Sequence, residues 1–306
     1  MFSILRIRFI ASTILILACT LASTLASALA HATAINPASI TIGLIPYENP
    51  ENLREGGEDL ARLLEAKIGV PVKIFVSKDY VGLVDAMKEK KVDFGFFSAM
   101  TYVMAEKSAG AQVLLKKVWE SPYYYSTILV RADSKITKLS QLKGKKFAYV
   151  DQKSASGFLY PQVHFKKEGI DPTKFFGETV FSGNHELSTK MLLDKKVDAI
   201  ATYSNDEKLT DTAWNRFAPK GTKVKVRPIW VSEPIPNDPF CVRRDFYDKY
   251  PKIAYDLMYA LIELNEDPKE GPRFKKSIGV TSLMFATSPQ YEPVREMVKV
   301  LDLKLE

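Results

Sequence analysis

Hydroxyl groups and a glycine come together directly after one short apolar run of the sequence. The segment Asp151–Gly157, which contains Ser154, Ala155 and Ser156, follows Phe147–Val150. At a strand-to-helix turn, serines offer hydroxyl donors and the backbone offers N–H groups at the positive end of a helix dipole, which is how proteins hold phosphate-like anions. The segment therefore predicts an oxyanion site. The alternative is that Ser154 only caps a helix.

Two further polar side chains stand at matching places in the sequence. Tyr80 and His185 each follow a short apolar run and a capping residue, Asp79 or Asn184, at the predicted start of a helix. In doubly wound sheets, ligands gather outside the carboxyl ends of the strands. Tyr80 and His185 are therefore predicted to face a shared crevice from opposite sides. The alternative is that both are ordinary residues at a capped helix boundary.

The sequence contains none of the common catalytic or metal-binding motifs. Beyond residue 34 it has two histidines, His164 and His185, and one cysteine, Cys241. It has no His-Glu-x-x-His, no Gly-x-Ser-x-Gly and no glycine-rich dinucleotide motif. Cys241 stands in an apolar run and is interpreted as core filler. We predict no catalytic residue, no metal and no cofactor.

The elements that must hold these side chains begin after an export signal. Met1–Arg8 carries two positive charges, Phe9–Leu25 is uncharged and apolar, and small residues lead up to Ala34. This order predicts a signal peptide over residues 1–34 and a periplasmic protein. One alternative is a retained membrane anchor, which needs about 20 mainly apolar residues. The other is a lipoprotein signal that ends at Cys19, which would then carry the lipid.

Length and composition describe an ordinary folded protein. The 306 residues are 46% hydrophobic and 26% charged, which excludes disordered, collagen-like and multi-span membrane proteins. The length suggests about two domains. The net charge of +7 includes Arg6 and Arg8, and the lysines are scattered singly or in short pairs. We therefore predict no binding to nucleic acid.

Short apolar strands alternate with amphipathic helices, and the pattern repeats at an offset of 105 residues. The alternation predicts an α/β protein with two similar lobes, each a mostly parallel sheet flanked by helices. The matched segments are Ile42–Ile45 with Phe147–Val150, Val72–Val76 with Gly177–Phe181, and Lys90–Asp93 with Lys195–Asp198, the last pair being identical.

Two extended segments are predicted to cross between the lobes. Ser121–Val130 reads as a strand, and Ser232–Phe240 contains three prolines that favour a stiff, extended chain. Residues 35–126 then form the first part of lobe one, 127–233 form lobe two, and 234–306 return to lobe one. Helical patterns over Asp245–Asn265 and Pro289–Leu303 complete lobe one. Hinges are expected near residues 127 and 232.

Five segments in this order resemble the signature of periplasmic phosphonate-binding proteins, within the phosphate/phosphite/phosphonate family of ABC-transporter solute receptors. The resemblance runs from about residue 40 to about residue 301. It implies a two-lobed periplasmic-binding-protein fold of type II and a monomeric receptor. The receptor would carry phosphite, phosphonate or phosphate to a membrane permease and its ATPase. The segments are Lys78–Gly82, Ser121–Ser126, Ser154–Phe158, Asn184–Glu186 and Pro234–Pro239.

The resemblance also implies a set of ligand contacts and two departures from the family pattern. Ala155 would offer a backbone N–H where many relatives have threonine, and Asn205 stands where receptors for aminoethylphosphonate use glutamate. The sequence therefore predicts a ligand without an amine. The remaining implied contacts are Tyr80, Tyr124, Ser154, Ser156, His185 and Asp238.

Two alternatives to an import receptor remain open at this stage. The first is a periplasmic anion-sensing receptor of a signalling system, which would bind in the same way. The second is an enzyme on the same fold, such as the pyrimidine synthases of thiamine biosynthesis. Those enzymes are not exported and carry a cysteine cluster, which Cys241 alone cannot supply.

Overall fold

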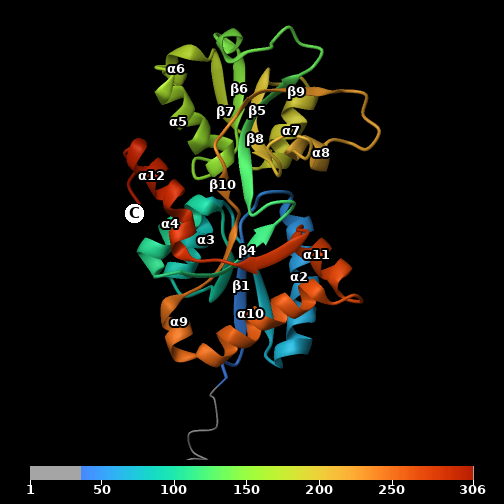
Figure 1. Cartoon of the computed structure of the whole chain (residues 1–306), viewed down its shortest axis with the longest axis vertical. Coiled ribbons are helices and arrows are strands. Elements are labelled where there is room, and N and C mark those ends of the chain that lie inside the picture. The colour runs from blue at the N-terminus through green and yellow to red at the C-terminus, as the bar shows by residue number, and fades with distance from the viewer. Residues whose placement is uncertain (1–35, 306) are drawn as a thin grey trace, which may run out of the picture. The chain divides into compact units, whose positions relative to one another are not determined.

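Two six-stranded sheets organise residues 36–305, the part of the chain that the computed structural model describes (Figure 1). Both sheets belong to the unit Ala38–Glu306. The predicted signal peptide and Cys19 lie outside the described residues. Within the described part, no helix is both long enough and apolar enough to cross a membrane.

The first sheet is mixed, with the order β12-β4-β11-β3-β1-β2. β1 pairs in parallel with β2 and β3, whereas β11 runs antiparallel to both of its neighbours and β12 runs antiparallel to β4. The antiparallel strands come from the returning part of the chain. The strands are β1 (Ile40–Leu44), β2 (Val72–Val76), β3 (Phe94–Phe96), β4 (Gln112–Val118), β11 (Pro239–Val242) and β12 (Ser282–Phe285).

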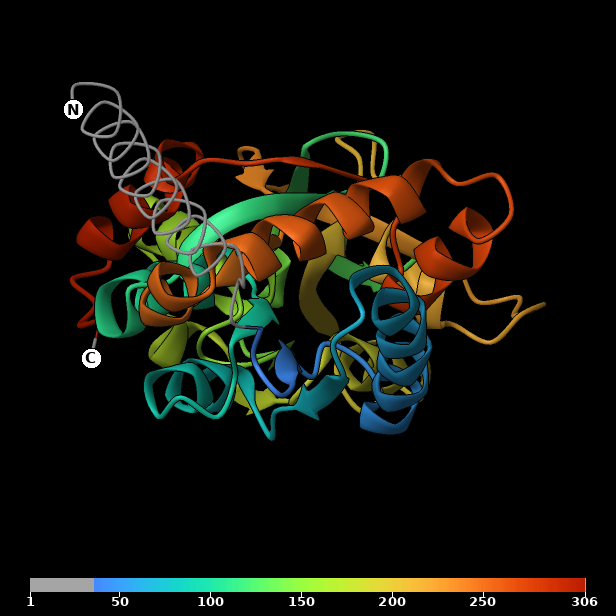
Figure 2. The same cartoon turned by 90° about the horizontal axis from the view of Figure 1, so that it is seen from below.

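Helices cover both faces of the first sheet (Figure 2). On one face lie α2 (Pro50–Ile68), α10 (Pro251–Glu266) and α11 (Gly271–Ile278), whose buried side chains share one apolar cluster. On the other face lie α3 (Tyr80–Lys88), α4 (Ala99–Ala109) and α12 (Glu292–Val300). The turn η3 (Ser288–Tyr291) leads into α12.

The predicted helix over Asp245–Asn265 is wrong in one respect, because the structure breaks it into α9 (Arg244–Lys249) and α10. The break falls at Tyr250, which precedes Pro251. Proline disfavours the helical conformation in the residue before it and itself fits the first position of a helix. Pro251 therefore ends one helix and starts the next.

The second sheet has the order β10-β5-β8-β6-β7, with β9 also paired to β5. The turn η1 (Leu139–Leu142) precedes β6. The helices α5 (Tyr160–Lys167) and α6 (Pro172–Phe175) pack on one side, and α7 (His185–Leu193) and α8 (Ala213–Phe217) on the other. The strands are β5 (Tyr123–Arg131), β6 (Lys146–Tyr149), β7 (Glu178–Phe181), β8 (Ala199–Ser204), β9 (Val226–Val231) and β10 (Ile235–Pro236).

The predicted repeat is present in the strand register. Ile42 of β1 pairs with Ile74 of β2, and Phe147 of β6 pairs with Thr179 of β7, so both parallel pairs join residues 32 apart. α7 begins 105 residues after α3. The two lobes therefore share one βαβ plan, as predicted.

The repeated Lys-Lys-Val-Asp motif has a structural role in both lobes. Lys90 and Lys195 adopt left-handed backbone conformations, with φ of 62° and 57°, in the turn after a helix. The carboxylates of Asp93 and Asp198 then accept hydrogen bonds of 2.9 Å from backbone N–H groups of β1 and β6 respectively. The motif ends a helix and anchors the next strand, so it serves the fold and not the ligand.

Candidate functional site

A pocket lies where both lobes contribute side chains. It is lined by residues that follow or belong to strands of each sheet, and all eight residues singled out in the sequence are among them. The lining residues are Ile45, Tyr47, Tyr80, Ser98, Lys117, Trp119, Tyr124, Ser154, Ala155, Ser156, His185, Tyr203, Asn205, Arg216 and Asp238.

The serine loop forms one wall through a tight turn at the end of β6. Ala155–Leu159 forms a π-helical turn, labelled η2, and the Ser154 Oγ accepts a hydrogen bond of 3.0 Å from the Gly157 N–H. A Cβ at Gly157 would lie 2.5 Å from the Cβ of Val150, so only glycine fits. The Ser154 hydroxyl caps the turn through its oxygen, which leaves its hydrogen free to donate into the pocket.

Tyr80 and His185 occupy equivalent first positions of α3 and α7. Their capping residues are those predicted: Asp79 accepts from the Gly82 N–H and Asn184 accepts from the Leu187 N–H, both at 2.8 Å. The tyrosine is 2% and the histidine 5% exposed, and both line the pocket. Capping and lining of the pocket are thus compatible, because Asp79 and Asn184 cap the helices and the residues after them line the pocket.

His185 is neutral at pH 7 in this structure. Burial lowers its pKa to about 3. Its Nδ1 lies 2.8 Å from the Thr202 Oγ1, and its ring meets Tyr203 edge-on. When the Thr202 hydroxyl donates to Nδ1, the imidazole keeps its proton on Nε2, where it serves as a hydrogen-bond donor.

Asp238 is the acidic group of the pocket lining. Burial raises its pKa to about 6, against the opposing charge of Lys117. Burial also raises the pKa of Tyr80 and of Tyr124 well above the usual range, and the Asp238 charge adds to both shifts. The two phenols therefore keep their protons and are available as donors.

Asn205 is held in place by its own loop. Its Nδ2 donates to the Asp211 Oδ2 at 2.8 Å, and the residue is 6% exposed. The Asp206 carboxylate accepts from the backbone N–H groups of Thr210 and Asp211. Neither Asp206 nor Glu207 lines the pocket. The described loop therefore supplies an amide, and no carboxylate, to this wall.

Sequence reasoning missed several lining residues. Lys117 lies in β4 and Arg216 in α8, two elements that were not identified from the sequence. The signal for the first was the pair Lys116-Lys117 inside a strand-like run, where charged residues are unusual. The other missed residues are Ile45, Tyr47, Ser98, Trp119 and Tyr203.

Three consecutive residues of lobe one contact lobe two beside the pocket. The carbonyl of Tyr47 accepts from the His185 N–H at 3.2 Å, and the Asn49 N–H donates to the Glu186 Oε2 at 2.9 Å. Between them, Glu48 forms an ion pair of 3.0 Å with Arg216. The described structure thus has the lobes in contact around the pocket.

The sequence of this chain matches a known protein family. A family described as "ABC transporter, phosphonate, periplasmic substrate-binding protein" matches residues 42–291. The chain belongs to this family.

Within residues 36–305, no group of three or more His, Cys, Asp or Glu side chains is placed to hold a metal ion.

A relative of known sequence agrees with this assignment, and two proteins of known structure share the fold. The phosphonates-binding periplasmic protein of Escherichia coli is 30% identical over 280 residues, which cover 87% of this chain and 80% of that protein. A binding protein of an ABC phosphonate transporter from Pseudomonas aeruginosa has a TM-score of 0.74 at 24% identity, covering 86% of each chain. A Prochlorococcus marinus protein, solved in complex with methylphosphonate, has a TM-score of 0.75 at 19% identity and covers 87% of this chain and 99% of that one. The two structural likenesses support the two-lobed fold.

Proposed function

We propose that this protein is the solute-binding component of an ABC importer and that it captures a small phosphorus oxyanion between its lobes. The observation that carries the proposal is the convergence of three helix starts, those of α3, η2 and α7, on one pocket. Helix N-termini favour negative charge, and each of these starts adds a neutral donor.

The donors of this pocket suit a tetrahedral oxyanion. The Ser154 and Ser156 hydroxyls, the backbone N–H of Ala155 and the phenols of Tyr80 and Tyr124 supply hydrogen bonds from several directions. The His185 imidazole adds another donor. Asp238 accepts a hydrogen bond from a protonated P–OH group. Asn205 contacts the substituent on phosphorus.

Lobe closure would enclose the ligand. The proposed lobe one comprises residues 35–126 and 234–306 and lobe two residues 127–233, with hinges near Thr127 and Ser232. At these boundaries the crossing segments β5 and β10 extend into lobe one and still pair in the second sheet. The contacts from Tyr47, Glu48 and Asn49 to lobe two then form on closure. The closed monomer, exported by the signal of residues 1–34, delivers its ligand to a membrane permease and ATPase without chemical change.

The names of the relatives support this class of ligand. One relative is named a phosphonates-binding protein, one a phosphate-import protein, from Mycolicibacterium smegmatis, and one a probable phosphite-binding protein, from Prochlorococcus marinus. These names span three phosphorus oxyanions.

Calorimetric titration with phosphite, phosphate, methylphosphonate, aminoethylphosphonate and sulfate tests the proposal. At least one phosphorus oxyanion should bind more tightly than sulfate. Because an amide stands at position 205, aminoethylphosphonate should bind at least about tenfold more weakly than the best amine-free ligand. Tightest binding of sulfate, or no binding of any phosphorus compound, would show the proposal to be wrong.

A further inference from the structure

Lys117 is a buried ammonium group that has aromatic neighbours and no hydrogen-bond or ion-pair partner among the described residues. It lies in β4 and is 5% exposed. Its Nζ lies 5.1 Å from the ring centres of Tyr47 and Phe96, and it forms no hydrogen bond or ion pair with another side chain of residues 36–305. A buried charge is costly unless it is paired. The pocket therefore contains a cation that lacks a protein anion in contact with it.

Lys117 remains largely charged at neutral pH. Burial lowers its pKa to about 8, with the Asp238 carboxylate acting in the opposite direction. The lysine also lines a second, smaller cavity that adjoins the first and shares Ile45, Tyr47 and Asp238 with it. Its ammonium thus stands beside space that a ligand can enter.

A second cation reaches the same end of the pocket from the other lobe. Arg216 of α8 lies with its guanidinium 5.5 Å from the ring centre of Tyr47 and pairs with Glu48. Its side chain is 32% exposed. Arg216 is therefore partly neutralised and partly solvated, and Lys117 is the group that most lacks a counter-ion.

The two ends of the pocket differ in charge. The Asp238 charge raises the pKa of Tyr80 and of Tyr124, after burial as the larger cause, and it also acts on Tyr203 and Lys117, so Asp238 lies between the serine loop and the other end. Burial also raises the pKa of Tyr47 and of Tyr203; the Glu48 charge adds to both shifts, and the Arg216 charge acts in the opposite direction. The second end, formed by Tyr47, Tyr203, Lys117 and Arg216, has two cations; within the described residues Arg216 is paired with Glu48, whereas Lys117 has no ion-pair partner, and we call it the cationic end.

We propose that the ligand carries a second anionic group, which binds Lys117 at this cationic end while the phosphoryl group binds at the serine loop. The ligand class is a phosphonate or phosphate ester that bears a carboxylate or a second phosphoryl group. This inference rests on the proposed function, because it assumes that the first anion is a phosphorus oxyanion. Lys117 is then a specificity-determining residue.

The competing role for Lys117 is that of a counter-ion for Asp238. Lys117 lies in β4 and Asp238 directly precedes β11, the strand that pairs with β4; the Lys117 N–H donates to the Asp238 carbonyl at 2.9 Å. No ion pair joins their side chains within the described residues. A counter-ion for Asp238 would affect every ligand alike, whereas a ligand contact affects only ligands with the second anion.

The decisive comparison uses ligands that differ in charge and little in shape. Phosphonoacetate carries a carboxylate where phosphonoacetamide carries a neutral amide. We expect calorimetry on the wild-type protein to give at least about tenfold tighter binding for phosphonoacetate. Methylenediphosphonate tests the second phosphoryl group, and its binding relative to phosphonoacetate tells which of the two anions is preferred.

Two lysine variants localise the effect. Lys117→Met should bring the affinity ratio of phosphonoacetate to phosphonoacetamide close to one. Lys116→Met is the matched control, because Lys116 is the preceding residue of β4, is 1% exposed and does not line the pocket. It should leave the ratio as in the wild type. Lys117→Gln serves in the same way if the methionine variant does not fold.

Four outcomes would overturn the inference. Equal binding of the acid, the amide and methylenediphosphonate would show that the second anion is not recognised. An equal loss of affinity for phosphonoacetate and phosphonoacetamide in Lys117→Met would show that Lys117 acts as a counter-ion for Asp238. Binding of methylphosphonate without any preference for an acidic substituent would leave the proposed function intact and refute this inference alone, whereas no binding of any phosphorus ligand would refute both.

Discussion

At the scale of single residues, Ser156 is the most direct test of the serine loop. Its backbone carbonyl already accepts from the Ser126 hydroxyl at 2.6 Å, a contact that an alanine at position 156 would keep. Ser156→Ala should therefore fold normally and lose one hydrogen bond to a charged ligand. We expect roughly ten- to a hundredfold weaker binding by calorimetry, since such a bond contributes about 1.5–3 kcal/mol.

The matched control for this variant is Ser108→Ala. Ser108 lies in α4, donates to the Met104 carbonyl and does not line the pocket. It should bind as the wild type does. Unchanged affinity in a folded Ser156→Ala variant would remove Ser156 from the set of ligand contacts.

His185 should make the unliganded protein sensitive to acid. Folding lowers its pKa from the ordinary 6.5 to about 3, so between these values the unfolded chain binds more protons. The free energy of unfolding should therefore fall as pH decreases through this window, by roughly 2–3 kcal/mol at pH 4.5. Asp238, whose pKa is raised to about 6, acts in the opposite direction below that pH.

Chemical denaturation of the wild type and of His185→Gln at pH 7 and pH 4.5 measures this contribution. The variant should lose less stability on acidification than the wild type does. An identical loss in both proteins would mean that the imidazole takes up its proton without unfolding the site.

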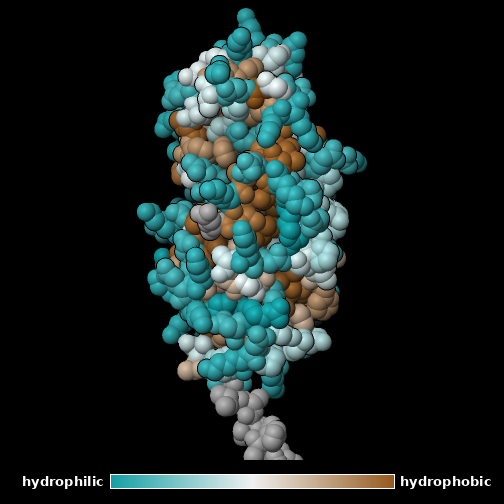
Figure 3. All heavy atoms as spheres, turned by 90° about the vertical axis from the view of Figure 1, so that its left-hand side faces the viewer, coloured by the Kyte–Doolittle hydropathy of each residue, from teal (hydrophilic) through white to brown (hydrophobic). Residues whose placement is uncertain are grey.

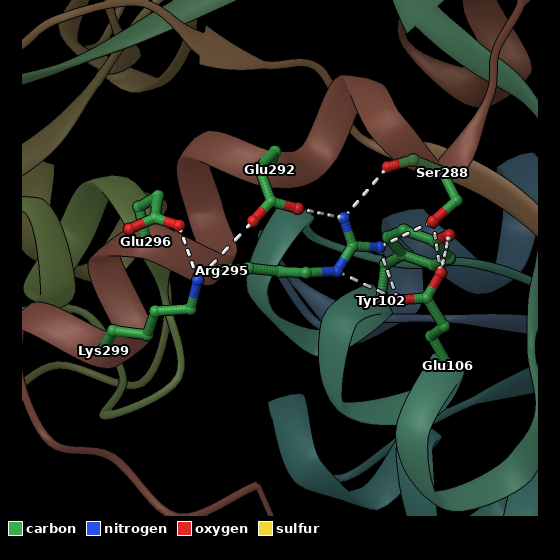
Figure 4. Close-up of polar contacts among 7 residues, drawn as sticks. All are labelled: Tyr102, Glu106, Ser288, Glu292, Arg295, Glu296 and Lys299. Atoms are coloured by element: carbon green, nitrogen blue, oxygen red, sulfur yellow. Dashed lines mark hydrogen bonds and ion pairs between the residues drawn. The ribbon is translucent and has the colours of Figure 1, made fainter.

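At the scale of elements, one polar network fixes α12 against α4 (Figure 4). Arg295 of α12 binds the Glu106 carboxylate of α4, which also accepts from the Tyr102 hydroxyl at 2.7 Å. Although burial acts to raise the pKa of Glu106, hydrogen bonds from Ser288, Arg295 and Tyr102 lower it overall. The carboxylate is thus charged and depends on its partners.

Removing the cation of this network should cost stability. Arg295→Met leaves the half-buried Glu106 charge without its guanidinium, and we expect a loss of about 1–3 kcal/mol in chemical denaturation. Lys299→Met is the control on the same helix. Lys299 pairs with Glu296 at 2.6 Å and with Glu292 at 3.7 Å, and because both pairs are exposed their loss should leave the unfolding midpoint unchanged. Equal effects of the two variants would contradict this account.

At the scale of the whole unit Ala38–Glu306, apolar and polar contacts both join the lobes. The apolar cluster around the pocket contains Val84 and Met100 of lobe one together with Val150 and Leu159 of lobe two. Figure 3, which shows the side at the left of Figure 1, has hydrophobic side chains gathered between more hydrophilic regions above and below. α12 adds a polar bridge, since the Lys166 Nζ of α5 donates to the Val300 carbonyl at 2.8 Å.

The contact between Glu186 and the Asn49 N–H tests lobe closure. It joins the two lobes and lies outside the pocket lining, so opening of the lobes breaks it. Glu186→Ala should weaken binding of the best phosphorus ligand about three- to tenfold, mainly through a faster dissociation rate. Stopped-flow fluorescence measures both rates.

Glu178→Ala provides the comparison for this variant. Glu178 pairs with Lys146 at 2.7 Å within lobe two and makes no contact across the pocket. Its rates should match those of the wild type. A Glu186→Ala variant that changed only the association rate would argue against a role in holding the closed form.

Local features of this protein were determined by the sequence alone. Capping residues such as Asp79 and Asn184, the repeat of strands and helices, and the serine turn after β6 depend on neighbouring residues and on backbone preferences. Because these interactions form within short segments of the chain, the sequence of each segment was enough to predict them. The resemblance to a family added the set of pocket residues in the same way, from motifs of three to six residues.

Only the tertiary structure decided which distant residues complete the pocket. Lys117, Arg216 and Tyr47 come from separate elements, and nothing near them in the chain marks them as neighbours of Ser154 or His185. The antiparallel strands β11 and β12 also depend on packing between remote segments. Burial, which lowers the pKa of Lys117 and raises that of Asp238, exists only once the chain is folded, because it is the surrounding protein that excludes water from these charges.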